Sequence, residues 1–336
     1  MKKFKYIILG SGIAGYGALE ELLKETKDIC VISKEGPCFL RPLLSKTTFS
    51  SYNIHVTYLP DIYDSITFIR EEVTSIDMEN KCINGKYTYE TCIYALGAEN
   101  RKLNMENAYY LRHVEDFYRI KRELPFISEI GIVGGGMIGL EVADLLSKMH
   151  KKVNVYEYMD WLIPRYFSKE DSEYLVHLLE KKGIMVQCHA RKDSYEEKVV
   201  LVSIGNTKNN LFERAIVVDE YMKFTEDVFA CGDCVEGNFM LWHEAYQQGR
   251  IAGQNALGKM VCFERKGYPV LFHLGKVGVC ACETKLEGNV QKIIHESLFS
   301  INDSAEETYI SIHDHKLVVI GDLRYVDWIQ KGECII

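Results

Sequence analysis

Residues 5–35 read KYIILGSGIAGYGALEELLKETKDICVISKE, and this stretch decides the fold of the chain. Residues 6–9 form a short apolar run that is typical of a buried strand. The run stops at Gly10-Ser11-Gly12-Ile13-Ala14-Gly15, a G-x-G-x-x-G turn that opens a helical pattern. Strand, glycine turn and helix in this order predict a phosphate-binding unit, and we call residues 10–15 the first glycine loop.

Each glycine of the loop has a physical reason to be there. Gly10 permits the tight turn, Gly12 lets a pyrophosphate approach the backbone, and Gly15 lets the helix lie close to the strand. Unpaired amides at the start of the helix would face the anion. The helix is amphipathic, and we expect its charged residues to face solvent: Glu20, Glu21, Lys24 and Glu25.

The unit occurs twice, which separates it from a chance glycine-rich turn. Residues 130–133 lead into Gly134-Gly135-Gly136-Met137-Ile138-Gly139, the second glycine loop. A helix over 140–149 and a strand over 153–156 ending at Glu157 follow. Two such units in one chain predict two bound dinucleotides.

Composition bounds the remaining possibilities. A length of 336 residues with 47% hydrophobic content is enough for two or three domains, each with its own core. The net charge of −8 argues against nucleic acid or an anionic membrane as the partner. The opening MKKFKYIILG has too short an apolar run for a signal peptide or an anchor, so we expect neither.

Eleven cysteines are scattered without framework spacing, so we expect a reducing cytoplasm. Two spacings stand out, Cys231-x-x-Cys234 and Cys280-x-Cys282. Since neither has a second cysteine or histidine pair at metal-ligand spacing nearby, we expect no metal. A reactive thiol pair at Cys231 and Cys234 stays open, and core packing is the favoured interpretation.

The other segments complete an α/β pattern. We expect strands over 68–76, 86–96, 198–204, 215–218 and 228–231, with helices over 169–182 and 242–257. From about Phe263 the pattern changes, because 270–282, 308–313 and 316–321 alternate like strands, with a turn at 314–315. This part predicts a small β-rich or α+β domain.

Six ordered motifs carry a family resemblance. They are GSGIAG, RPLLSK at 41–46, YALGA at 94–98, GGGMIGLE at 134–141, FTEDVFACGD at 224–233 and WHEAYQQGRIAG at 242–253. In this order they resemble the FAD-dependent pyridine nucleotide-disulfide oxidoreductase superfamily over nearly the whole chain. Within it the chain is most similar to the NADH:rubredoxin reductase branch, which includes ferredoxin-reductase-like proteins and the flavoprotein part of nitrite reductases.

The resemblance implies an α/β fold class of glutathione-reductase type. It has two three-layer Rossmann-like domains, for FAD and NAD, and a small C-terminal α+β domain. We place the discontinuous FAD domain at residues 1–106 and 208–262, the NAD domain at 107–207 and the C-terminal domain at 263–336. The NAD domain is short, since only 22 residues separate Gly183 and Gly205, where family members usually fit an antiparallel excursion.

The family roles carry over onto matching residues. FAD in the first loop would contact Gly10, Gly12, Ile13, Ala14, Gly15, Glu35, Arg41, Lys46, Val73, Ala95, Gly97, Gly232 and Asp233. Among these, Arg41 would lie near the pyrophosphate, the Val73 backbone would meet the adenine, and Asp233 would bind the ribityl chain. NADH in the second loop would contact Gly134, Gly136, Met137, Ile138, Gly139, Glu157 and Gly205.

The acidic residue that binds the ribose departs from the pattern in the first unit. Glu157 lies 23 residues after Gly134, whereas 23 residues after Gly10 is Ser33. The nearest carboxylate is Glu35, which we assign to the FAD ribose. Glu157 would accept a hydrogen bond from a 2′-hydroxyl and repel a 2′-phosphate, so NADH is expected over NADPH.

The residues implied at the flavin are Lys46 and Glu141. Thiol-using relatives need a cysteine close to Leu44, while the nearby Cys38 is more simply structural. Lys46 would pair with Glu141 and stabilise the anionic reduced flavin, which raises its potential. A plain interdomain ion pair is an equally open interpretation.

These features predict an enzyme that passes a hydride from NADH to FAD and then single electrons to a small carrier such as rubredoxin or ferredoxin. One alternative is an NADH oxidase or peroxide-reducing enzyme, for which Trp242 and His243 would lie near the flavin, although packing is the simpler role for both. Another is a non-catalytic, NADH-responsive flavoprotein. We expect a monomer or homodimer and no nucleic-acid or membrane partner.

Overall fold

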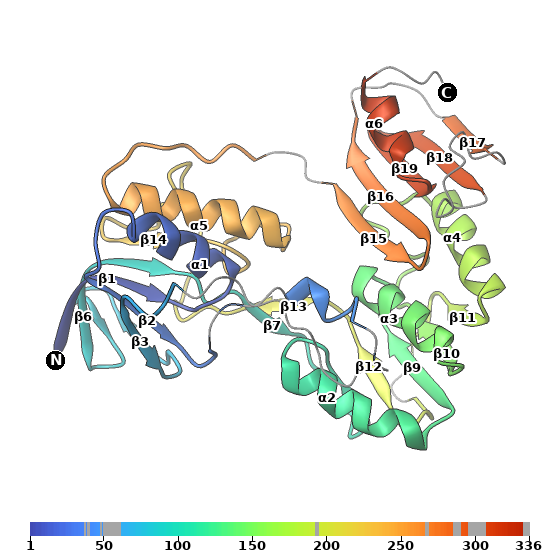
Figure 1. The fold of residues 1–336 in the computed structure, drawn as a ribbon, viewed down its shortest axis with the longest axis horizontal. Helices are drawn as coiled ribbons and strands as arrows, with labels where there is room; N and C mark the ends of the chain where they lie inside the picture. The colour runs from blue at the N-terminus through green and yellow to red at the C-terminus, as the bar shows by residue number, and fades with distance from the viewer. Residues whose placement is uncertain are drawn as a thin grey trace. The chain divides into compact units, whose positions relative to one another are not determined.

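A computed structural model describes residues 1–36, 38, 41–47, 49, 62–191, 195–265, 269–284, 290–294 and 307–331 (Figure 1). Its contacts divide the chain into two compact units. The first unit comprises Met1–Pro42, Val56–Glu99 and Asn206–Lys266. The second comprises Leu43–His55, Asn100–Gly205 and Gly267–Ile336.

The first unit is built on a seven-stranded sheet in the order β3-β2-β1-β6-β5-β4, with β14 beside β6. Five strands are parallel: β1 (Lys2–Leu9), β2 (Ile29–Ser33), β3 (Thr67–Arg70), β6 (Tyr87–Tyr94) and β14 (Val228–Ala230). The antiparallel edge consists of β4 (Ile76–Asp77) and β5 (Cys82–Ile83). The carboxyl ends of the parallel strands therefore meet at one edge of the sheet.

Two helices lie side by side in this unit, α1 (Ile13–Leu22) and α5 (Trp242–Ala256) (Figure 1). Their backbones approach closely, because a Cβ on Gly249 would lie 1.9 Å from the carbonyl oxygen of Ala14. Glu21 was predicted to be exposed, and this was wrong: its side chain is buried. Its carboxylate accepts hydrogen bonds from Arg250 Nε on α5 and Lys24 Nζ, each at 2.7 Å.

The second unit contains a parallel five-stranded sheet in the order β11-β10-β9-β12-β8. Its strands are β8 (Ala108–Tyr109), β9 (Glu129–Val133), β10 (Lys152–Tyr156), β11 (Ile184–Gln187) and β12 (Val200–Val202). Its helices are α2 (Val114–Glu123), α3 (Met137–Lys148) and α4 (Lys169–Lys181), with a 3-10 turn η2 (Leu124–Phe126). Another 3-10 turn, η1 (Arg41–Leu43), precedes Lys46.

An antiparallel sheet completes the second unit, in the order β15-β16-β19-β18-β17. Its elements are β15 (Val270–Leu274), β16 (Val277–Glu283), β17 (Val290–Ile294), β18 (Thr308–His313), β19 (Lys316–Gly321) and helix α6 (Arg324–Lys331). One face shares a core with α3, where Leu140, Phe272 and Val318 belong to the same buried cluster. The other face is covered by α6 through Tyr325 and Ile329.

Three strand predictions need correction. Residues 68–76 are not one strand, because β3 ends at Arg70 and β4 begins only at Ile76. Residues 270–282 form the hairpin of β15 and β16 and not one strand, because the chain turns at Gly275, which has φ +66°. Residues 215–218 are not a strand, although Ile216 is buried. The turn at residues 314–315 between β18 and β19 is confirmed.

A buried carboxylate connects α4 to the antiparallel sheet. Asp171 is fully buried and closes the capping box at the start of α4, accepting from the Ser168 amide at 2.8 Å. It also accepts hydrogen bonds from Tyr309 Oη and His313 Nε2 on β18, both at 2.8 Å, and from the Ser311 hydroxyl. Each lone-pair direction of this carboxylate thus has a donor, as burial requires.

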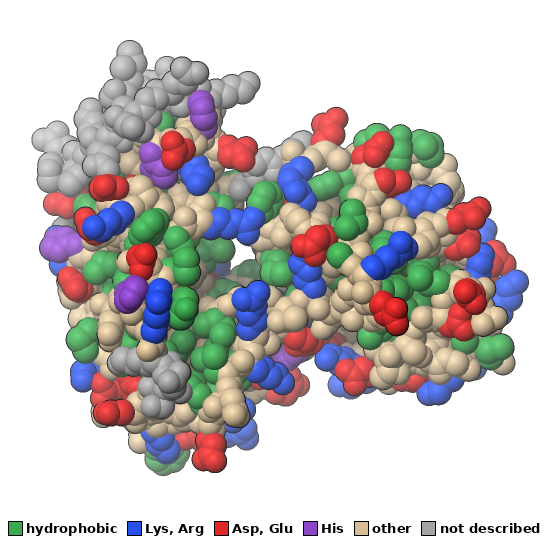
Figure 2. All heavy atoms as spheres, turned by 180° about the vertical axis from the view of Figure 1, so that it is seen from behind, with side chains coloured by type: hydrophobic (Ala, Val, Ile, Leu, Met, Phe, Trp, Pro, Cys, Tyr) green, Lys and Arg blue, Asp and Glu red, His purple; other side chains and the backbone are tan. Residues whose placement is uncertain are grey.

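The predicted α/β fold class is confirmed by these parallel sheets and their covering helices. A small two-stranded sheet of β7 (Ala98–Asn100) and β13 (Asn206–Lys208) accompanies them. Among the residues that the structure describes, no helix is long and apolar enough to cross a bilayer. The face seen in Figure 2 carries basic and acidic side chains intermingled, in keeping with the modest net charge of −8.

The contact between α1 and α5 gives a first prediction. Gly249→Ala should force the helices apart beside the first glycine loop and cost about 1–3 kcal/mol of stability, as overpacked cores do. We expect a lower melting temperature by calorimetry and, on gel filtration followed by absorbance, loss of the FAD that the family resemblance implies. Gln247→Ala on the same helix is the control, and equal behaviour of the two variants would show that the contact can relax.

Candidate functional site

The first glycine loop is shaped by close backbone contacts. Gly10 has φ +100°, and a Cβ there would lie 2.4 Å from the carbonyl oxygen of Ala95. A Cβ on Gly15 would lie 2.0 Å from the carbonyl oxygen of Gly10. The Gly10 amide donates to the carbonyl of Ile32 at 2.8 Å, which joins the loop to the end of β2. Only glycine fits these positions.

The residues predicted at the FAD site converge on this loop from several strand ends. Ala95 and Gly97 follow β6, Gly232 and Asp233 follow β14, and Val73 lies beyond β3. A Cβ on Gly232 would come within 2.8 Å of the Ala14 Cβ, so the end of β14 lies against the start of α1. The carboxyl edge of the sheet, at the switch point between β1 and β6, is where this class of sheet binds its ligands.

A polar network that sequence reasoning missed holds the turn after β14. Gln248 Oε1 accepts from the Gly232 amide at 2.9 Å and from Asn238 Nδ2 at 3.0 Å. Asn238 Nδ2 also donates to the Gly232 carbonyl at 2.8 Å. Because Gln248 and Asn238 are both buried, this network fixes the left-handed backbone of Gly232, φ +80°, and the position of Asp233 next to it.

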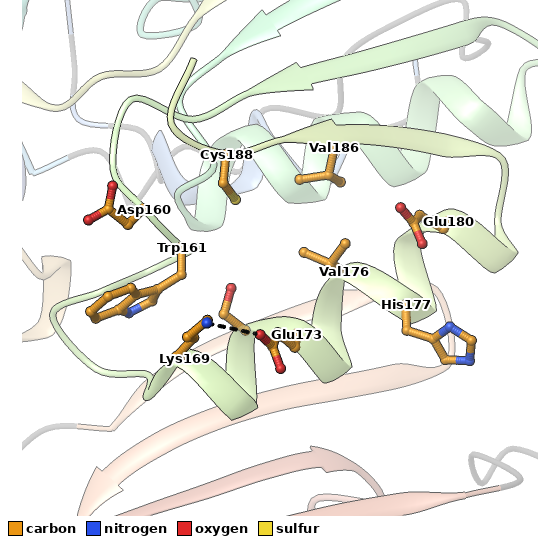
Figure 3. A pocket seen from close by; sticks show the side chains of 10 residues that line it. Asp160, Trp161, Lys169, Glu173, Val176, His177, Glu180, Val186 and Cys188 are labelled. Atoms are coloured by element: carbon orange, nitrogen blue, oxygen red, sulfur yellow. Dashed lines mark ion pairs between the residues drawn. The ribbon is translucent and has the colours of Figure 1, made fainter. Parts of the chain in front are cut away.

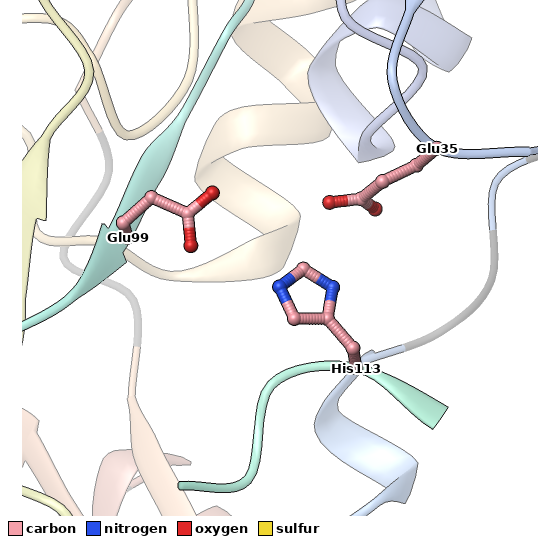
Figure 4. Close-up of side chains that lie close together, drawn as sticks. All are labelled: Glu35, Glu99 and His113. Atoms are coloured by element: carbon pink, nitrogen blue, oxygen red, sulfur yellow. The ribbon is translucent and has the colours of Figure 1, made fainter. Parts of the chain in front are cut away.

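Acidic and basic side chains form ion pairs near the end of β2. The Glu35 carboxylate forms an ion pair with the Arg41 guanidinium. Glu99, on β7, has a carboxylate oxygen within 4.8 Å of one of Glu35 and pairs with Lys34 at 3.1 Å (Figure 4). Two carboxylates held in this way would accept hydrogen bonds from sugar hydroxyls and would repel an additional phosphate.

The second glycine loop repeats the geometry of the first. Gly134 has φ +106°, and a Cβ there would lie 2.2 Å from the Ser203 carbonyl oxygen, beyond β12. A Cβ on Gly139 would lie 2.3 Å from the Gly134 carbonyl oxygen. The Gly134 amide donates to the Tyr156 carbonyl at 2.8 Å, at the end of β10. Gly205 follows β12 with φ +87°.

Glu157 lies where the sequence pattern places a ribose-binding carboxylate. It follows β10 and is 9% exposed. Its Oε2 accepts from the Gly135 amide at 2.6 Å and its Oε1 from the Met159 amide at 2.8 Å. A carboxylate held by two amides keeps its orientation.

The geometry of both loops fits a dinucleotide pyrophosphate. The N-cap residues of α1 and α3 are Gly12 and Gly136, and neither helix start is capped by a side chain. A Cβ on Gly136 would meet nothing within 4 Å, so the backbone there is open to a ligand. Helix amides that lack a side-chain acceptor and face open space suit a phosphate group.

Lys46 and Glu141 form the ion pair that the resemblance implies, within the second unit. Glu141, on α3, is 5% exposed. Its second oxygen accepts from the Ser45 hydroxyl at 2.5 Å, a contact that sequence reasoning missed although Ser45 adjoins Lys46. Leu44 is also buried, at the position where thiol-using relatives need a cysteine.

Cys38, Cys231, Cys234 and Cys280 are placed as core residues. Burial raises the pKa of the Cys38 thiol to about 12, so it is protonated at neutral pH. Cys231 and Cys234 are buried, burial raises the pKa of both thiols, and Cys234 Sγ lies 3.2 Å from the Cys231 carbonyl oxygen. The pKa of Cys280 is raised by a hydrogen bond with Cys282 and by burial. None of these environments favours a reactive thiolate.

Trp242 and His243 open helix α5. Trp242 is half exposed, and its ring meets the imidazole of His243 edge-on at 5.7 Å. Burial lowers the pKa of His243, which favours the neutral imidazole at neutral pH. This ring contact agrees with the packing role and does not by itself indicate an acid or base.

A pocket of about 300 Å³ lies between α4, β11 and the loop after β10 (Figure 3). It is lined by Asp160, Trp161, Lys169, Ser172, Glu173, Val176, His177, Glu180, Val186 and Cys188. Its ion pair, Lys169 to Glu173 at 3.6 Å, is about two-thirds exposed on both sides. An exposed ion pair of this kind contributes little energy. It does not fix the lining of the pocket as a preorganised binding site would require, and we assign no ligand to it.

Two glycine loops at two parallel-sheet switch points define a protein that uses two dinucleotides. Residues 4–249 match the pyridine nucleotide-disulphide oxidoreductase family. The chain is 26% identical to the NADH-rubredoxin oxidoreductase of Clostridium acetobutylicum, over 99% of this chain and 95% of that protein. It is 28% identical to the NADH oxidase of Methanocaldococcus jannaschii, over 79% and 72%.

The crystal structure of the Clostridium acetobutylicum NADH:rubredoxin oxidoreductase has the same fold, with a TM-score of 0.80, 24% identity and coverage of 98% of this chain and 94% of that one. The chain belongs to the pyridine nucleotide-disulphide oxidoreductase family. It is an oxidoreductase that uses FAD and NADH, which confirms the enzyme class and the cofactors predicted from the sequence.

The raised pKa of Cys38 gives a pH prediction. Because its thiolate forms only near pH 12, no long-wavelength thiolate–flavin absorbance should develop between pH 6 and pH 9. Cys38→Ser should leave the flavin spectrum and the rate of reduction by NADH unchanged. A band that grows with pH in the parent and is missing in the variant would instead show a thiolate at the flavin.

Proposed function

We propose that the protein transfers electrons from NADH through FAD to a small iron-containing carrier protein of the rubredoxin or ferredoxin type. The observation that carries the proposal is that two complete dinucleotide loops accompany a buried leucine, Leu44, where thiol-using relatives need a cysteine. The name of the Clostridium acetobutylicum relative, which shares nearly the full length of the chain, supports this acceptor.

FAD, when bound, accepts a hydride from NADH and passes on its electrons one at a time. The chain supplies the binding and the orientation. The helix starts at Gly12 and Gly136 receive the pyrophosphates, and Asp233, at the turn held by Gln248, receives the ribityl hydroxyls. The other cofactor contacts are those predicted: Ile13, Ala14, Arg41, Val73, Ala95 and Gly97 for FAD, and Met137, Ile138, Gly139 and Gly205 for NADH.

Lys46 and Glu141 keep their proposed role of placing a positive charge for the reduced flavin. Glu141 is buried and accepts from both Lys46 and Ser45, so its carboxylate is restrained at both oxygens. A restrained carboxylate holds the lysine ammonium in one position, which a flexible exposed lysine would not keep.

Three further parts of the proposal concern the setting of the enzyme. No disulfide joins the cysteines in the described part of the chain, and a reducing cytoplasm is proposed on this ground. The division into FAD, NAD and C-terminal domains at residues 107, 208 and 263 is retained as a proposal within the two compact units. A monomer or homodimer is also proposed.

The reductase proposal predicts a kinetic order of acceptors. In anaerobic stopped-flow experiments, NADH should reduce the bound flavin quickly, and rubredoxin or ferredoxin should reoxidise it far faster than oxygen does. Reoxidation by oxygen at the same rate would favour an NADH oxidase, the activity named for the Methanocaldococcus jannaschii relative. Slow reduction by both NADH and NADPH would favour a non-catalytic flavoprotein.

The amide-held carboxylate of Glu157 predicts the choice of nucleotide. Glu157→Ala should reduce the preference for NADH over NADPH by about tenfold or more, because one charge-assisted hydrogen bond to the ribose is lost and a repulsion is removed. The ratio of kcat/KM values for the two nucleotides measures it. Asp160→Ala, an exposed acid in the same loop, should keep the ratio, and an unchanged ratio in Glu157→Ala would remove Glu157 from the role.

The charge of Lys46 should be visible in the flavin potential. Lys46→Met should lower the two-electron midpoint potential, and a fall of about 30 mV corresponds to a tenfold change in the equilibrium constant. Lys46→Arg keeps a cation and should stay near the parent value. Equal potentials in the parent and Lys46→Met would leave the ion pair with a structural role only.

A further inference from the structure

The two glycine loops share a backbone but differ at two paired positions. The residue after the first glycine is Ser11 in one loop and Gly135 in the other. The residue 23 positions after the first glycine is Ser33 in one unit and Glu157 in the other. The first unit therefore combines a serine in the loop with a serine after it, and the second combines a glycine in the loop with a glutamate after it.

The combination of glycine and glutamate has a steric reason. Glu157 Oε2 lies 2.6 Å from the Gly135 amide, so the carboxylate lies directly against the loop. A Cβ on Gly135 would be 3.1 Å from that oxygen and 2.3 Å from Leu162 Cδ2. A side chain at this loop position would clash first with Leu162 and would also crowd the carboxylate at the end of the second strand.

In the first unit two small hydroxyls fill the same place. Ser11 and Ser33 are 4% and 6% exposed, and their hydroxyl oxygens lie 3.0 Å apart. Ser11 Oγ donates to the Gly36 carbonyl at 2.7 Å, and Ser33 Oγ accepts from the Glu35 amide at 3.2 Å. Since each hydroxyl has one proton, the Ser33 hydroxyl donates to Ser11, and the chain of bonds runs from Glu35 through both serines to Gly36.

We propose that Ser11 and Ser33 are positioning residues that move recognition of the FAD adenosine ribose from the end of β2 to Glu35, two residues further on. The serine pair fills the space of a carboxylate and fixes the turn of residues 33–36 against the glycine loop. Glu35 is then the acceptor for the ribose hydroxyls, with its carboxylate restrained by Arg41. This inference rests on FAD occupying the first glycine loop.

The pairing can be exchanged between the units. Ser33→Glu alone would place a carboxylate against the Ser11 Cβ, as the space around Gly135 shows. Ser11→Gly together with Ser33→Glu would recreate the combination of the second unit. In that double variant the ribose should be bound by residue 33, and Glu35 should become dispensable.

The test measures cofactor affinity and does not depend on turnover. FAD is removed from the purified holoprotein, and dissociation constants are measured by flavin fluorescence for FAD, for its 2′-deoxyadenosine analogue and for FMN. The parent should prefer FAD over the deoxy analogue by about tenfold or more. Glu35→Gln should abolish that preference and Ser33→Ala should reduce it, while FMN affinity stays at the parent value in both.

The Ser11→Gly/Ser33→Glu variant should keep the preference for FAD, and adding Glu35→Gln to it should change nothing. Ser75→Ala, an exposed serine of the same unit, is the matched control. The proposal is overturned if Glu35→Gln keeps the preference, or if Ser33→Ala weakens FMN and FAD equally. These affinities are independent of the reductase proposal, which is tested by the rates of flavin reduction and reoxidation.

Discussion

The structure depends on one close contact, made twice, between the last glycine of each loop and the carbonyl oxygen of the first. A Cβ would lie 2.0 Å from that oxygen at Gly15 and 2.3 Å at Gly139, well inside any real contact. Without side chains there, each helix starts directly above the end of its strand, and its free amides point to open space. A side chain at either position would push the helix away and remove the anion site.

On this shared backbone the two units differ in the side chains that meet the sugar. The residue proposed for the ribose is Glu157 in the second unit, where two amides brace it, and Glu35 in the first unit, where it follows a pair of buried serines. The family membership therefore describes the scaffold and the cofactors, while we propose that the choice between nucleotides lies in a few residues at the ends of β2 and β10.

The sequence predicted the local features well because each of them depends on residues that are close together in the chain. Both glycine loops, the strands beside them and the helices that follow were predicted from spacing alone. Contacts between distant segments were not predicted. Glu21 looked exposed because its partner Arg250 lies 229 residues away in the sequence, and the contact of Ser45 with Glu141 spans 96 residues. The hairpin at Gly275 was missed because its strands continue one alternating pattern across the turn.

The contacts of Asp171 have a consequence for how the second unit folds. Tyr309, Ser311 and His313 come from the antiparallel sheet, yet they satisfy a fully buried carboxylate on a helix of the nucleotide-binding sheet. Detaching the antiparallel sheet would break these three hydrogen bonds and expose the shared core that contains Leu140, Phe272 and Val318 to water, at a cost of several kcal/mol. The change in sequence character near Phe263 therefore does not separate two parts that unfold independently. Both sheets of this unit should unfold together in one transition.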